Sequence, residues 1–142
     1  MNLPDSMVWI TEKIDLKNNY LIYYWSISCG FCKVYFKDLQ LWKLRYPNLD
    51  ILLIHLPTSE HALNASEVAK VYNEFEMNLP CCLDNNHDLK DIINPNSYTP
   101  QMYLYIDNEL VMGGIGDMVI ENIDKKLLEL NKKIHLIVDL VD

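Results

Sequence analysis

Apolar residues along this chain gather in short continuous blocks separated by segments with helical spacing. Three blocks, residues 20–25, 50–56 and 101–106, are almost wholly apolar. Each block predicts a strand. The first two are expected to be covered on both faces, because a strand with one solvent-exposed face would alternate apolar and polar residues. Shorter strands are predicted at residues 6–11, 79–83 and 109–112.

Helices are predicted between these strands, where apolar residues recur three and four positions apart. They cover residues 29–46, 64–75, 87–93 and 123–141. Pro47 ends the first helix, and a capping box at residues 64–67 opens the second. Residues 14–17 are expected to form a turn or brief helix. Gly113, Gly114 and Gly116 are expected to form a flexible corner.

This order of elements predicts an α/β protein with a central mixed sheet flanked by helices. Alternating strands and helices give parallel strands first, and a hairpin followed by a helix closes the sheet. The length of 142 residues fits a single domain spanning residues 1–142. No internal repeat or linker divides it.

Composition narrows the possible partners. Half of the residues are hydrophobic, and the net charge of −8 argues against nucleic acid or an anionic membrane as partner. The first six residues lack the basic and apolar regions of a signal peptide, and no apolar run reaches the ~18 residues of a transmembrane helix. With Met1 as the natural start, a cytoplasmic location is expected. A mature secreted domain whose signal has been removed stays an alternative.

The chemistry of the chain centres on Cys29-Gly30-Phe31-Cys32, between the strand at residues 20–25 and the first helix. A C-x-x-C at such a junction is typical of redox proteins. A helix N-terminus favours an anion and so lowers the pKa of Cys29, and Cys32 one turn later can resolve a mixed disulfide. The alternatives are half a zinc site or two unrelated core thiols.

A zinc site lacks the rest of its ligands in this sequence. A second C-x-x-C is missing, and the four histidines are scattered. Cys81 and Cys82 are adjacent, so in a strand they point to opposite faces. We expect both to be structural, and we expect neither a dedicated metal site nor a cofactor.

Four motifs together resemble the TlpA/ResA-like thiol-disulfide oxidoreductases of the thioredoxin superfamily. They are Trp25-x-x-x-Cys29-x-x-Cys32, Leu-Asp-Asn-Asn-His-Asp-Leu at residues 83–89, Thr99-Pro100, and Leu-Tyr-Ile-Asp at residues 104–107. The similarity covers about residues 9–130. It implies a thioredoxin-like fold with the TlpA/ResA-type helix-strand insertion, at roughly residues 64–83.

The resemblance also implies roles for individual residues. Cys29 is the implied nucleophile and Cys32 the resolving thiol. Pro100 is the implied cis-proline, which exposes the Thr99 backbone to substrate and keeps metal off the thiols. The implied substrate-binding residues are Trp25, Gly30, Phe31, Thr99 and Pro100. Trp25 is expected to pack beside the site, and a core aromatic at the end of the strand is compatible with that role.

Two positions depart from the family pattern. Tyr23 stands where thioredoxins have a buried acid, and Tyr35 stands where relatives of ResA have a glutamate. The usual proton carriers for Cys32 are therefore absent. Either tyrosine, His55 or water is left as a substitute.

The sequence thus predicts a thiol-disulfide oxidoreductase, acting as a reductase of protein or small-molecule disulfides. Its partners are a disulfide-bearing protein or small thiol substrate and an upstream reductant. The uncharged Gly30-Phe31 pair favours this direction, whereas the lack of a proline between the cysteines argues for a more oxidising couple. The alternative is a thioredoxin-fold binding or redox-sensing module with little turnover. A metal carrier using Cys29 and Cys32 is a third, minor alternative.

Overall fold

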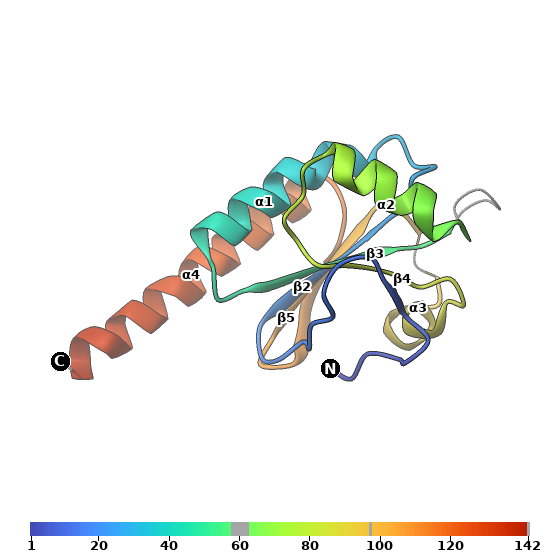
Figure 1. The fold of residues 1–142 in the computed structure, drawn as a ribbon. Coiled ribbons are helices and arrows are strands. Elements are labelled where there is room, and N and C mark those ends of the chain that lie inside the picture. Colours follow the sequence, from blue (N-terminus) through green and yellow to red (C-terminus); the bar gives the residue numbers. More distant parts are fainter. Residues whose placement is uncertain (58–62, 97, 142) are drawn as a thin grey trace.

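Six strands form one mixed sheet in this computed structural model, which describes residues 1–57, 63–96 and 98–141 (Figure 1). The strand order across the sheet is β1-β4-β3-β2-β5-β6. The strands are β1 (Val8–Trp9), β2 (Tyr20–Trp25), β3 (Asp50–His55), β4 (Cys81–Leu83), β5 (Gln101–Ile106) and β6 (Glu109–Gly114). Strands β2, β3 and β4 are parallel, while β1, β5 and β6 pair antiparallel with their neighbours. The predicted α/β class with a mixed sheet is confirmed.

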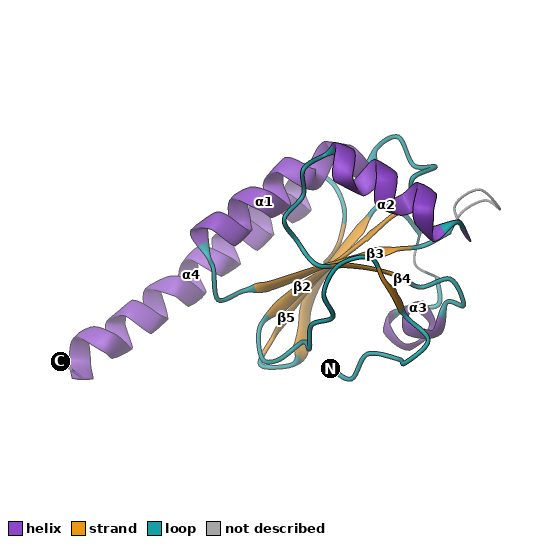
Figure 2. Ribbon diagram, in the orientation of Figure 1, coloured by secondary structure: helices purple, strands orange, loops and turns teal. Residues whose placement is uncertain are grey.

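Helices cover both faces of the sheet (Figure 2). They are η1 (Cys32–Tyr35, a 3₁₀ turn), α1 (Phe36–Arg45), α2 (Ala65–Glu74), α3 (Asp88–Ile93) and α4 (Asp117–Val141). Side chains of α1, α2 and α4 pack on one face, and α3 packs with the N-terminal segment on the other. In Figure 1 the C-terminal part of α4 extends well beyond the sheet. None of the helices in the described ranges is long and apolar enough to cross a bilayer.

The burial of strand β2 on both faces of the sheet explains why apolar and polar residues do not alternate in its sequence. Leu21, Tyr23 and Trp25 enter the core beneath α1, whereas Tyr20, Ile22 and Tyr24 enter the core on the opposite face. All six side chains are buried. The strand therefore separates two hydrophobic cores, and its C-terminal end delivers the chain to the cysteine pair.

The segment around α2 and β4 lies where the helix-strand insertion was expected. Asn64 caps α2, because its side-chain oxygen accepts the N–H groups of Ser66 and Glu67 at 2.9 and 3.2 Å. After β4, the buried carboxylate of Asp84 accepts the N–H groups of Leu89 and Lys90 in the same way. The motif at residues 83–89 is thus a strand-to-helix turn in which Asp84 caps α3.

Two local predictions are wrong. Gly113 and Gly114 belong to β6 and do not form a corner. Glycine is needed at 113 because a Cβ there would lie 2.7 Å from a ring carbon of Tyr103 on the neighbouring strand. The first helix begins at Cys32, as a 3₁₀ turn, and not at Cys29.

Candidate active site

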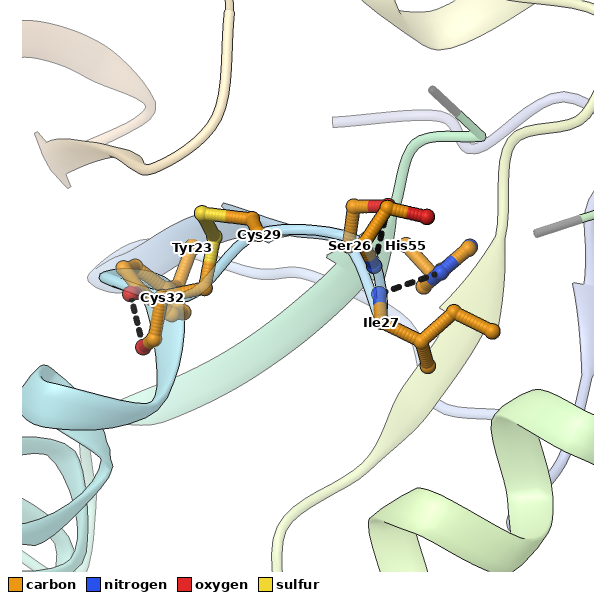
Figure 3. Close-up of a disulfide and its surroundings, with 7 residues drawn as sticks. Tyr23, Ser26, Ile27, Cys29, Cys32 and His55 are labelled. Carbon is orange, nitrogen blue, oxygen red and sulfur yellow. Dashed lines mark hydrogen bonds between the residues drawn. A yellow bond between two sulfur atoms is a disulfide. The ribbon is translucent and has the colours of Figure 1, made fainter. Parts of the chain in front are cut away.

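Cys29 and Cys32 are joined as a disulfide in the loop and first helical turn after β2 (Figure 3). Their Cα atoms are 5.5 Å apart. Cys29 is half-buried, whereas the side chain of Cys32 is 0% exposed. An incoming thiol or disulfide can therefore reach only the sulfur of Cys29.

Hydrogen bonds to described residues fix the backbone of the loop before Cys29. The Cys29 N–H donates to the carbonyl of Ser26 at 3.0 Å, and the Ser28 N–H donates to the Ser26 hydroxyl at 3.3 Å. The Ile27 N–H donates to Nε2 of His55, on β3, at 3.1 Å (Figure 3). The side chain of His55 thus bonds this loop to the sheet.

Tyr23 lies directly beneath the cysteine pair. Its hydroxyl donates to the carbonyl oxygen of Cys32 (Figure 3). Burial raises the pKa of Tyr23 well above the ordinary value of 10. Tyr23 therefore keeps its proton at neutral pH and binds the backbone of Cys32, so it is not available as a base for the Cys32 thiol.

The imidazole of His55 is completely buried. It stands edge-on to Trp25, with ring centroids 5.1 Å apart, and burial lowers the pKa of His55 to about 4. At neutral pH the ring is uncharged, and Nε2 is the acceptor that the Ile27 N–H requires.

The remaining predicted site residues lie at the same end of the sheet. Gly30 and Phe31 are exposed, with 75% of the Phe31 side chain accessible. The Thr99–Pro100 peptide bond is cis and both residues are half-buried. They lead directly into β5, whose first residue pairs with Tyr24 of β2. The end of β2 and the start of β5 therefore meet next to the disulfide loop.

No protein-family model matches the chain, but a curated relative and several solved structures do. The thiol-disulfide oxidoreductase YkuV of Bacillus subtilis (strain 168) is 30% identical over 86 residues, 60% of this chain and 57% of YkuV. The chain thus matches little more than half the length of that relative. A thioredoxin-like protein solved in its oxidized form superposes with a TM-score of 0.70 and 25% identity, over 86% of this chain and 89% of that one.

The exposed lipoprotein thioredoxin Etrx1 of Streptococcus pneumoniae strain TIGR4 shares the fold. Its TM-score is 0.64 at 20% identity, over 79% of this chain and 84% of Etrx1. The chain is therefore similar to thiol-disulfide oxidoreductases and shares the fold of the thioredoxin superfamily. The predicted thioredoxin-like fold is therefore confirmed.

One predicted contact of this thioredoxin-like protein is wrong. Trp25 was expected among the substrate-binding residues, but its side chain is 0% exposed. It packs between Phe36 and His55, whose rings it meets edge to face. Trp25 is a core residue beneath the disulfide loop, and it offers no surface to a substrate.

Cys81 and Cys82 lie on opposite faces of the thioredoxin-like sheet, as the alternation of a strand predicts. Cys81 belongs to the core beneath α1, and Cys82 belongs to the core on the other face. Both thiols are free and buried, and burial raises the pKa of Cys81 to about 12 and that of Cys82 still further. Neither supplies thiolate near neutral pH.

Replacing both buried cysteines by alanine is expected to change the rate of insulin-disulfide reduction by no more than a few fold. Their raised pKa values and burial keep them out of thiol exchange. Insulin-disulfide reduction by Cys81→Ala/Cys82→Ala measures this, and Cys29→Ser provides the scale of a complete loss. A loss as large as that of Cys29→Ser would instead reveal a second redox pair.

Alkylation of the reduced protein is expected to modify Cys29 before any other cysteine. Cys29 is the only one of the four whose side chain is not fully buried. Substoichiometric iodoacetamide near neutral pH, followed by peptide mapping, measures the order. Labelling of Cys32 first would reverse the roles assigned to the two sulfurs.

Acid is expected to destabilise the fold through His55. The unfolded chain protonates His55 near pH 6.5, whereas the native state resists protonation until its pKa of about 4. Between these values the unfolded state binds more protons, so stability falls with falling pH, by about 3 kcal/mol in total. Urea unfolding at several pH values measures the slope. His55→Gln should flatten this part of the profile, and an unchanged slope would contradict the assignment.

Proposed function

We propose that this protein is a thiol-disulfide oxidoreductase that works through the Cys29/Cys32 pair, with residues 1–142 acting as one domain. The observation that carries the proposal is the asymmetry of the pair. Cys29 is partly accessible, Cys32 is fully buried, and the two are close enough to share a disulfide. The similarity to YkuV, a thiol-disulfide oxidoreductase, supports the same activity.

The reduction of a substrate disulfide takes two exchange steps. The Cys29 thiolate attacks one substrate sulfur, so that a mixed disulfide forms and the other substrate sulfur leaves as a thiolate that takes a proton. The Cys32 thiol then loses its proton and attacks the Cys29 sulfur, which releases the second substrate thiol. Two electrons have passed to the substrate, and the Cys29–Cys32 disulfide remains. An upstream dithiol or monothiol reductant must supply two electrons to restore the starting state.

Protein disulfides suit the surface around Cys29. Gly30 and Phe31 are exposed next to it, and the Phe31 ring offers an apolar contact to a polypeptide. The Thr99–Pro100 segment enters β5 at the same end of the sheet, where the Thr99 backbone could pair with an extended substrate. Gly30, Phe31, Thr99 and Pro100 form the proposed substrate-binding surface.

The proposed direction is reduction, in the cytoplasm. The Gly30-Phe31 pair carries no charge or imidazole that would stabilise the Cys29 thiolate and make the couple more oxidising. Etrx1, which shares the fold, is an exposed lipoprotein. The direction is tested by equilibrating the Cys29–Cys32 couple with glutathione buffers. A reduction potential of about −270 mV, that of thioredoxin, supports a reductase, while a potential of about −120 mV overturns the proposed direction.

A binding or redox-sensing module with little turnover is the second candidate. It is favoured by the tyrosine in place of the buried acid, because Tyr23 keeps its proton and bonds to the Cys32 carbonyl. The resolving step then depends on water or another group as base. Insulin reduction with dithiothreitol separates the two: sustained acceleration indicates the enzyme, and a redox-active pair without acceleration indicates the module.

A further inference from the structure

His55 is placed as a support for the reactive loop, although it touches neither sulfur in the structure. It is the last residue of β3 and pairs in the sheet with Trp25, the last residue of β2. The next three residues of the chain lead to Cys29. The Ile27 N–H of this segment donates to Nε2 of His55 across 28 positions of sequence.

The strand end that carries His55 is itself fixed. The carbonyl of His55 accepts the Asp84 N–H at 2.9 Å, and the following Leu56 N–H donates to the carbonyl of Trp25 at 2.8 Å. The Trp25 ring restricts the imidazole from the side, with an interplanar angle of 84°. The acceptor nitrogen is therefore held at a defined position relative to β2.

The other ring nitrogen shows what the histidine contributes. With Nε2 as acceptor, a neutral ring carries its proton on Nδ1. Nδ1 is buried and has no hydrogen-bond partner among the described residues. A buried donor without a partner destabilises a fold, so a histidine is unfavourable here as mere filling. The hydrogen bond from the Ile27 N–H is an interaction that His55 makes and that a leucine of similar size could not make.

We propose that His55 is a positioning residue for Cys29. Its neutral imidazole accepts the Ile27 N–H and so fixes the loop from Ser26 to Cys29, which holds the attacking sulfur in the loop that precedes the first helical turn. The inference rests on Cys29 being the reactive thiol of the proposed function. The pKa of His55, lowered to about 4 by burial, keeps Nε2 available as acceptor throughout the neutral range.

Two substitutions separate positioning from packing. His55→Leu fills the space and removes the acceptor, while His55→Gln can place its amide oxygen close to the position of Nε2. The measured quantity is the pKa of Cys29, obtained from the iodoacetamide rate of the reduced protein between about pH 5 and pH 9. We expect His55→Leu to slow alkylation at neutral pH by about 3-fold to 10-fold, since each unit of raised pKa removes a factor of ten in thiolate. His55→Gln is expected to restore most of the rate.

The control is Cys82→Ala, a buried substitution on the opposite face of the sheet, which should leave the Cys29 rate unchanged even if the fold is destabilised. An unchanged Cys29 pKa in folded His55→Leu would overturn the proposal. If His55→Leu does not fold, the ¹⁵N-labelled wild-type protein still tests it. A scalar coupling between the Ile27 amide nitrogen and His55 Nε2 is expected, and its absence would exclude the bond. These readings need no substrate turnover, so failure of insulin reduction would count against the proposed function alone.

Discussion

Replacing Cys29 by serine is expected to abolish disulfide reduction, with a loss of about 100-fold or more in rate. The serine hydroxyl is not ionised near neutral pH, so the attacking anion is lost. No other cysteine can take over, because Cys81 and Cys82 are buried with raised pKa values and Cys32 is fully buried. A 100-fold loss corresponds to about 2.7 kcal/mol in the barrier.

Replacing Cys32 by serine is expected to have a different outcome. Attack by Cys29 can still occur, but the mixed disulfide cannot be resolved from within the protein. Incubating Cys32→Ser with a disulfide-bearing protein should therefore yield a covalent, thiol-sensitive complex. Cys29→Ser should yield none. Cys82→Ser is the matched control for the loss of one buried thiol. If Cys29→Ser formed the complex equally well, the attacking sulfur would not be that of Cys29.

The central strands could be predicted from the sequence because burial on both faces leaves a clear mark. Strands β2 and β5 coincide with the predicted ranges, since their residues are apolar regardless of which way they point. The cysteine pair could be placed because it follows β2 immediately. The start of α2 was also predictable, since an Asn64 cap is a local signal that depends on only a few residues.

The support of the site could not be predicted in the same way. The bond from Ile27 to His55 depends on the register of β2 against β3, which no local pattern specifies. A histidine as the last residue of a buried strand was the available signal, and the sequence left it among several possible proton carriers. The contacts of Trp25 could not be predicted for a related reason. An aromatic residue at a strand end near a cysteine can lie over the site or beneath it, and only packing decides.

The buried position of Trp25 leads to the second large effect. Trp25→Ala is expected to lower the free energy of unfolding by about 3–5 kcal/mol, because removing a large buried side chain leaves a cavity. The cavity would open between Phe36 and His55, whose rings contact the indole. Urea or thermal unfolding measures the loss. Trp25→Phe keeps an aromatic ring and should recover much of the stability.

Substrate affinity distinguishes this core role from the contact that the sequence suggested. Phe31 is the comparison, since 75% of its side chain is exposed beside Cys29. Phe31→Ala should raise KM for a protein disulfide while leaving the free energy of unfolding within about 0.5 kcal/mol, as for most surface substitutions. Trp25→Phe should do the reverse, with KM unchanged and stability reduced. A raised KM in Trp25→Phe at undiminished stability would show that the indole contacts substrate. Because Trp25 is buried beneath the loop, we do not expect this result.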